Sequence, residues 1–303
     1  MPGHHRQDTT KDQTVNEALR ALLEQIVDYA GLFPPAALDV PAAARNYASY
    51  RSSPDRWMLG RFVVGSAQVV ELRDEVERLH PADAPWPISV VAADAGQARA
   101  ALDIPSDTLL AVESVEVRIH AADVDELARR AGNRELYVEV PLDSTLESRL
   151  DAIASSGARA KIRTGGTTPE AFPQATDVLR FLRGCAERNL SFKATAGLHH
   201  PLCGVYRLTY EPAAISGTMF GFLNIFLAAL LVRQGIGDGE ALALLTETGA
   251  SALRLEDDAL VWRDRRITAA AIRAGRMRFA TSFGSCSFRE PVDELPWQPA
   301  SVA

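Results

Sequence analysis

The stretch 135–163, ELYVEVPLDSTLESRLDAIASSGARAKIR, carries the pattern that decides the fold. It predicts a strand over 135–140, an amphipathic helix over 144–155 and a second strand over 159–163. Short β-rich runs that alternate with helices are typical of a parallel sheet covered by helices. The chain is therefore expected to be an α/β protein built by repetition of this unit.

The same unit extends to both sides of this stretch. Further strands are predicted at 28–33, 61–65, 88–92, 110–117, 190–195 and 277–282. Further helices are predicted at 67–79, 94–101, 122–131 and 170–188, with Asp94, Asp143 and Thr168-Pro169 as helix starts. Eight strands in a chain of this length predict a (β/α)8 TIM barrel, which needs about 250 residues plus insertions. A doubly wound open sheet is the competing fold, but the glycine-rich fingerprint expected after its first strand is missing.

The domain organisation follows from the spacing of the strands. Residues 1–14 are expected to be a flexible tail, and residues 15–303 a single barrel domain. The interval of about 198–276 is too long for one crossover, so it predicts a helical insertion between the last two strands. Within it we expect helices near 214–234, 238–249 and 268–275, and a short hairpin in 253–263.

Composition limits the environment and the partners. Three cysteines without a C-x-x-C pair indicate a reducing compartment, and no signal peptide is visible, so a cytoplasmic protein is expected. A net charge of −7 argues against nucleic acid or an anionic membrane as partner. The apolar run at 219–232 is shorter than the ~20 residues that span a bilayer. It predicts a buried helix or a contact in a homo-oligomer, and leaves a small molecule as the expected partner.

Lysine is rare in this chain and its positions are informative. It occurs only at Lys11, Lys161 and Lys193, and all other basic residues are arginine. Lys11 falls in the predicted tail. A lysine that persists among arginines can mark a place where a compact amine must lose its proton.

Strand parity predicts where the other two lysines point. If Ala160 and Ile162 pack outward against helices, Lys161 and Arg163 point into the barrel. The same argument directs Lys193 and Thr195 inward, and also Tyr137 and Glu139. Two ammonium groups side by side in a poorly hydrated cavity favour loss of a proton, and a neutral amine can attack a carbonyl to form an imine. The alternative is that each lysine pairs with a carboxylate such as Glu139 or binds an anion.

Three motifs resemble those of the deoxyribose-phosphate aldolase family, which are class I (Schiff-base) aldolases. K-I-R-T-G at 161–165 resembles the family's strand-six lysine motif, K-A-T-A-G at 193–197 is similar to its strand-seven motif, and F-G-S-C-S at 283–287 resembles its final phosphate-binding turn. The resemblance implies that Lys161 forms the imine and that Lys193 tunes it. It also implies an anion pocket of Gly284, Ser285 and Ser287.

The acid or base of such a reaction is left open by the residues. The chain has no clear counterpart of the family's catalytic aspartate, and Glu139, Glu113 and Glu116 are the candidates. His199 is a further candidate for proton transfer, with His200 beside it in the substrate site. Together with Glu139 these histidines could instead hold a divalent metal, or they could be structural.

Small residues complete the predicted substrate site. The segment Thr164-Gly165-Gly166-Thr167 is predicted to form either an oxyanion or phosphate cradle or a left-handed turn. Cys286 lies in the final turn as a nucleophile or as a packed side chain. The predicted substrate-binding or anion-binding residues are Arg163, Thr164, Gly165, Gly166, Thr195, Gly197, His200, Gly284, Ser285, Cys286 and Ser287.

Three functions remain in competition at this point. The first is an aldolase-like lyase that forms a lysine imine with a small carbonyl compound and needs no cofactor or metal. The second is a metal-dependent barrel isomerase or hydrolase that uses His199 or His200. The third is a non-catalytic small-molecule-binding barrel, which the fold alone does not exclude.

Overall fold

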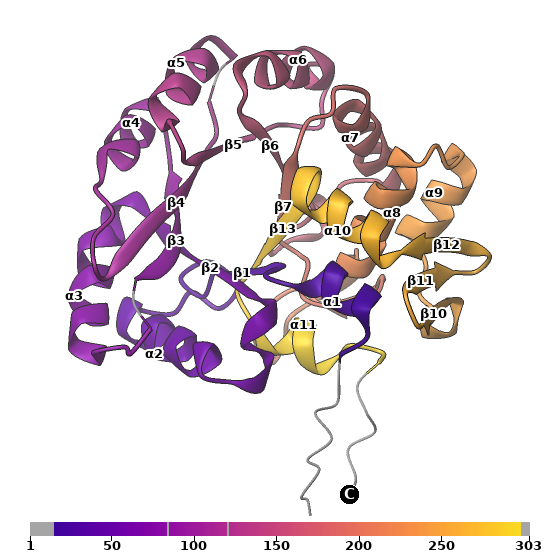
Figure 1. Cartoon of the computed structure of the whole chain (residues 1–303), viewed down its shortest axis with the longest axis horizontal. Coiled ribbons are helices and arrows are strands. Elements are labelled where there is room, and N and C mark those ends of the chain that lie inside the picture. Colours follow the sequence, from indigo (N-terminus) through magenta and orange to yellow (C-terminus); the bar gives the residue numbers. More distant parts are fainter. Residues whose placement is uncertain (1–14, 84, 120, 298–303) are drawn as a thin grey trace, which may run out of the picture.

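Eight parallel strands close into a barrel, so the TIM-barrel prediction is confirmed (Figure 1). The computed structural model describes residues 15–83, 85–119 and 121–297; the tail predicted at 1–14, with Lys11, lies outside the described residues. Around the barrel the strands follow the order β1, β13, β7, β6, β5, β4, β3, β2. Their bounds are β1 (Val27–Tyr29), β2 (Leu59–Gly65), β3 (Trp86–Ala92), β4 (Leu110–Val117), β5 (Glu135–Glu139), β6 (Arg159–Arg163), β7 (Phe192–Thr195) and β13 (Ala280–Ser285).

Helices surround the strands in chain order (Figure 1). The ring consists of α2 (Val40–Arg51), α3 (Val69–Leu79), α4 (Ala95–Asp103), α5 (Ala121–Ala131), α6 (Leu146–Ser156), α7 (Ala175–Glu187) and α8 (Phe222–Arg233). Asp94 caps α4, because its carboxylate accepts a hydrogen bond from Gln97 N. The other two predicted starts are wrong: α6 begins at Leu146, and Pro169 opens a single 3-10 turn before α7.

Strand parity places the core between strands and helices. Ala160 and Ile162 of β6, and Phe192 of β7, are completely buried. Phe192 meets Phe181 of α7 edge to face, with ring centroids 5.3 Å apart. The polar residues that alternate with them therefore face the barrel interior.

The first and last strands lie elsewhere than predicted. The last strand was expected at 277–282, but α10 (Ala269–Arg278) continues to Arg278 and β13 starts at Ala280. The first strand was expected at 28–33, but β1 ends at Tyr29 because the chain turns, with Phe33 N donating to Ala30 O. The F-P-P segment at 33–35 is consequently free to line the barrel mouth.

The insertion between β7 and β13 is mixed and not purely helical. It begins with the hairpin β8 (Gly204–Arg207) and β9 (Ser216–Met219), so the helix predicted over 214–234 starts only at Phe222. After α8 come α9 (Asp238–Leu245), the antiparallel sheet β10 (Leu253–Glu256), β11 (Ala259–Trp262) and β12 (Arg265–Thr268), and then α10. Two short helices, α1 (Glu17–Leu23) and α11 (Arg289–Asp293), complete the domain.

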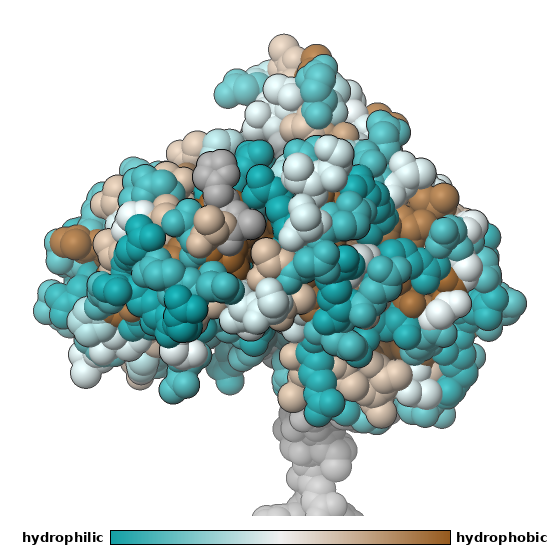
Figure 2. All heavy atoms as spheres, turned by 90° about the horizontal axis from the view of Figure 1, so that it is seen from above, coloured by the Kyte–Doolittle hydropathy of each residue, from teal (hydrophilic) through white to brown (hydrophobic). Residues whose placement is uncertain are grey.

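The surface agrees with an apolar core that lies between the strands and the helices. On the face drawn in Figure 2, hydrophilic residues dominate and hydrophobic ones form small separate patches. Across the described ranges, no helix combines the length and the hydropathy that a bilayer crossing needs.

The entry into α8 depends on a glycine in close contact with backbone. A Cβ added to Gly221 would lie 2.3 Å from Leu202 Cα and from Pro201 O, where nothing can move without shifting the main chain. We predict that Gly221→Ala lowers the free energy of unfolding by about 1–3 kcal/mol, the range for overpacked sites. Gly239→Ala in α9 is the control, because a Cβ there meets nothing within 4 Å. Urea denaturation of both variants measures the difference, and equal stability of the two would contradict the prediction.

Candidate functional site

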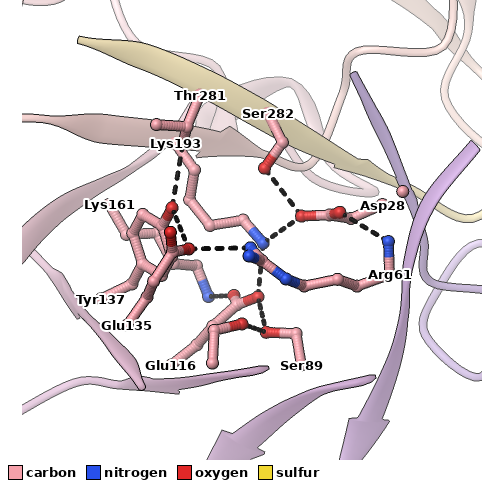
Figure 3. Close-up of polar contacts among 12 residues, drawn as sticks. Asp28, Arg61, Ser89, Glu116, Glu135, Tyr137, Lys161, Lys193, Thr281 and Ser282 are labelled. Atoms are coloured by element: carbon pink, nitrogen blue, oxygen red, sulfur yellow. Dashed lines mark hydrogen bonds and ion pairs between the residues drawn. The ribbon is translucent and has the colours of Figure 1, made fainter. Parts of the chain in front are cut away.

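The two barrel lysines share one carboxylate. Lys161 and Lys193 occupy paired positions on β6 and β7. Lys161 Nζ lies 2.8 Å from Glu116 Oε2, and Lys193 Nζ lies 2.6 Å from Glu116 Oε1. Glu116 belongs to β4, which is not adjacent to β6 or β7, so all three side chains point into the interior, as Figure 3 shows. Inward orientation and adjacency of the lysines are confirmed.

Further groups hold the carboxylate of Glu116 and the amine of Lys193 in place. Lys193 Nζ also lies 2.6 Å from Asp28 Oδ2 of β1. Asp28 accepts a hydrogen bond of 2.7 Å from Ser282 Oγ, and Glu116 accepts one of 2.7 Å from Ser89 Oγ (Figure 3). We call Asp28, Glu116, Lys161 and Lys193 the ionic cluster.

The carboxylates decide the electrostatics of the ionic cluster. Burial by itself would lower the pKa of Lys193, but the adjacent charges of Asp28 and Glu116 outweigh it and raise that pKa above its usual value. Burial would likewise raise the pKa of Glu116, but the two lysines hold it well below its usual range. The sequence-based expectation of two mutually repelling ammonium groups therefore needs correction, because a carboxylate lies between them.

A cavity of about 290 Å³ opens at the carboxyl ends of the strands, where barrel enzymes bind substrate. Lys161, Glu116 and Glu139 line it, and Lys161 Nζ lies 3.2 Å from Glu139 Oε2. Lys193 is fully buried and is not among the lining residues. The cavity therefore presents one amine flanked by two carboxylates.

Several predicted site residues meet in this cavity. The predicted residues that line it are Glu139, Lys161, Arg163, Gly166, Thr195, Gly197, His199, Gly284 and Cys286. Arg163 is exposed at the end of β6. It has no ion-pair partner among the residues that the structure describes. Phe33, Pro34 and Pro35 form the apolar side of the same cavity.

Other predicted residues have structural partners outside the lining. Thr164 Oγ1 donates to Ala196 O at 2.8 Å, and a Cβ added to Gly165 would collide with the ring of Phe172. Neither Gly165 nor Gly166 has a left-handed backbone, so the left-handed turn suggested for them is wrong; that conformation occurs at Gly197, with φ +72°.

The hydroxyl groups of Ser285 and Ser287, in the turn after β13, accept hydrogen bonds from backbone N–H groups. Ser285 Oγ accepts from Ser287 N at 3.3 Å, and Ser287 Oγ accepts from Glu290 N at 3.2 Å. Neither residue is among those lining the cavity. Of the predicted anion pocket of Gly284, Ser285 and Ser287, only Gly284 lines the cavity.

The side chains of His199 and His200 have different partners. His199 Nδ1 lies 2.9 Å from Glu290 Oε2 inside the cavity wall, whereas His200 stacks on Tyr206 and lies 2.7 Å from Glu294 Oε2. Among the residues that the structure describes, no group of three or more His, Cys, Asp or Glu side chains is arranged to hold a metal ion. The shared His199–His200–Glu139 metal site suggested by the sequence does not form.

A larger cavity of about 660 Å³ lies at the opposite, amino-terminal end of the barrel. Arg61 spans it, with ion pairs of 2.8 Å to Glu113 and 2.9 Å to Glu135. Glu113, one of the three acid or base candidates, is therefore remote from Lys161. Because barrel active sites lie at the carboxyl ends of strands, the smaller cavity is the candidate site.

Sequence reasoning missed several members of the site. Asp28 had a usable signal, since it alternates with buried Val27 and Tyr29 in β1 and must face inward. Glu290 and Tyr210 had none, because Glu290 meets His199 across 91 residues of chain and Tyr210 meets Cys286 across 76.

Comparisons with known proteins add little to the geometry. No protein-family model matches the chain, and no curated protein matches its sequence. Among solved structures, the chain is similar to a protein described as "QR15, an Aldolase", with a TM-score of 0.40 and 12% identity over 59% of this chain and 83% of that one. At that TM-score the likeness carries no argument, and the barrel assignment rests on the strand order itself.

His199 should make stability depend on pH. Burial alone would lower its pKa, but contacts with Cys286 and Glu290 raise the pKa to about 9. A raised folded-state pKa means that the folded protein holds this proton more tightly, so the stabilisation is complete below pH ~6.5 and is lost as pH rises through about 9. We predict that His199→Gln removes a stabilisation on the order of 3 kcal/mol at pH 6, and little at pH 10. Denaturant titrations across this range test it; a pH-independent difference would contradict it.

Proposed function

We propose that this protein is an aldolase-like lyase in which Lys161 forms an imine with a small carbonyl substrate. The observation that carries the proposal is that Lys161, alone among the lysines in the described part of the chain, lines the carboxyl-end cavity. The resemblance of the motifs at 161–165, 193–197 and 283–287 to class I aldolases supports the same chemistry.

Glu139 has the position needed to move the proton. Lys161 must first lose a proton, and Glu139 Oε2 at 3.2 Å can accept it. The amine then attacks the carbonyl carbon to give a carbinolamine. Glu139 returns the proton to its hydroxyl group, water leaves and the iminium forms, so the ammonium and the carbonyl become an iminium and one water.

Glu116 and Lys193 act as positioning residues in this proposal. Glu116 keeps its bond to Lys193 while Lys161 changes its charge, so the interior retains a counterion throughout. Lys193 in turn is fixed by Asp28, so Glu116 Oε1 stays paired with Lys193. The amine is therefore held in one orientation by groups that do not react.

The substrate class follows from a basic residue at the end of β6 that lines the cavity. Arg163 lines the cavity and has no counterion among the described residues. Its guanidinium group therefore favours a substrate with an anionic substituent such as a carboxylate or a phosphate. A cavity of about 290 Å³ limits the substrate to a small molecule. The proposed substrate is a short aldehyde or ketone that carries one anionic group.

Reductive trapping tests the imine directly. Incubation with borohydride and a panel of small aldehydes and ketones should leave a stable secondary amine on Lys161, because an imine is reducible and the amine is not. Intact-protein mass detects the adduct, and peptide mapping assigns it. Lys193 is the internal control, since it is fully buried on the neighbouring strand and should stay unmodified. An adduct on Lys11 only, or on no lysine with any carbonyl, would overturn the proposal.

The role of Glu139 has its own test. Glu139→Gln should slow adduct formation by about 10²-fold or more, the usual contribution of a general acid or base. Folding should persist, because Lys161 keeps Glu116 as its counterion. Glu113→Gln is the matched control, since Glu113 pairs with Arg61 at the other end of the barrel. Equal slowing in both variants would assign the effect to general destabilisation and reject the role of Glu139.

A further inference from the structure

Beside the lysine, the same cavity contains a second arrangement of reactive groups. We propose that Cys286, His199 and Glu290 form a thiol–imidazole–carboxylate triad that cleaves small esters or thioesters through an acyl-enzyme. The triad uses none of the groups assigned to imine formation. It is therefore an activity separate from that of Lys161.

The order of the three groups is that of a nucleophile, its base and the group that orients the base. Cys286 Sγ lies 4.0 Å from His199 Nε2, and the other ring nitrogen, Nδ1, lies 2.9 Å from Glu290 Oε2. A carboxylate on Nδ1 fixes the ring and leaves Nε2 for the thiol. Sγ lies at nearly equal distances from the two ring nitrogens, 3.9 Å from Nδ1 and 4.0 Å from Nε2, and because Nδ1 is engaged by Glu290 the proposal assigns the thiol to Nε2; such contacts commonly tighten only when substrate binds.

A fourth side chain holds the carboxylate. Tyr210, from the loop between β8 and β9, donates a hydrogen bond of 2.9 Å to Glu290 Oε2, and its hydroxyl lies 3.5 Å from Cys286 Sγ. The constellation is thus assembled from four separate segments: the loop after β7, the β8–β9 loop, the turn after β13, and α11. Such convergence on one thiol is not needed to pack a cysteine.

Substrate access distinguishes Cys286 from the other two cysteines. Cys286 and His199 both line the carboxyl-end cavity, although each is largely buried. Cys185 and Cys203 are buried outside this cavity, and burial raises the pKa of both thiols. Only Cys286 combines a neighbouring imidazole with an opening to the cavity among the described residues.

The proposed reaction balances with water as the only co-reactant. The thiol proton of Cys286 passes to His199 Nε2 as Sγ attacks the carbonyl carbon of the ester. The bond to the leaving group then breaks, and His199 protonates the departing alcohol or thiol, which leaves a thioester on Cys286. Water, deprotonated by His199, attacks this thioester; the carboxylic acid departs and the thiol regains its proton.

The charge state of the imidazole fits this role. The contacts with Cys286 and Glu290 raise the pKa of His199 to about 9, although its burial acts in the opposite direction. The ring that has accepted the thiol proton is therefore stabilised, and that proton is available to the leaving group. Glu290 stabilises the protonated ring, so it acts as a positioning residue.

The experiment uses the full chain and p-nitrophenyl acetate as the probe. We expect a burst of nitrophenolate and a mass increase of one acetyl group, mapped to Cys286. Cys286→Ser should lose at least 10²-fold of the burst rate while retaining the wild-type melting temperature, and His199→Gln should lose about 10²-fold. Cys203→Ala is the matched control, a buried cysteine without an imidazole, and should keep the full burst.

A pH profile separates a positioning role of Glu290 from a structural one. Glu290→Gln should move the rising limb of iodoacetamide alkylation at Cys286 to higher pH, because the protonated ring that favours thiolate formation loses its carboxylate. Slower alkylation with an unmoved profile would remove Glu290 from the triad.

Acetylation of Lys161 or Cys203 in place of Cys286, or an undiminished burst in Cys286→Ser, would overturn the proposal. None of these results bears on reductive trapping at Lys161, so the two proposals fail independently.

Discussion

The carboxylate of Glu116, shared between two buried lysines, is the interaction on which the rest of the site depends. Each lysine charge costs several kcal/mol to remove from water, and only a close counterion with satisfied hydrogen bonds offsets that cost. Glu116 meets both amines within 2.8 Å and accepts a further hydrogen bond from Ser89. Removing it would leave two ammonium groups facing each other in the interior. The positions of β4, β6 and β7 around the barrel are therefore constrained by charge as well as by packing.

Depth in the barrel separates the two lysines, which are otherwise alike in sequence and in strand position. Lys193 is enclosed between Asp28 and Glu116 and has no exposed surface. Lys161, one strand away, has Glu139 as its second carboxylate and lines the cavity. Desolvation and fixed counterions make the first a structural charge, whereas access to the cavity allows the second to react. A barrel interior that is usually filled by branched apolar side chains is here filled partly by ion pairs.

The insertion between β7 and β13 supplies one wall of the same cavity. Asn224 of α8 anchors it, because its side chain accepts from Cys203 N and donates to Leu244 O and Glu247 O, all at 2.7 to 2.9 Å. These bonds tie α8 to the segment that follows His199 and to the end of α9. The hairpin β8–β9, held at the same place, carries Tyr210 to Cys286 and Glu290. Thus the insertion is part of the site.

Local sequence determined the eight strands, the ring of helices and the inward direction of Lys161 and Lys193, because alternation along a strand and helical periodicity are properties of neighbouring residues. It did not determine the ends of β1 and β13 or the start of α8, where turn and hairpin geometry override propensity. Only the tertiary structure placed Glu116 between the two amines and joined Cys286 to His199 and Glu290. Glu116 and Lys193 are 77 residues apart, and His199 and Glu290 are 91 apart. Contacts over such distances depend on barrel closure, which no local pattern encodes.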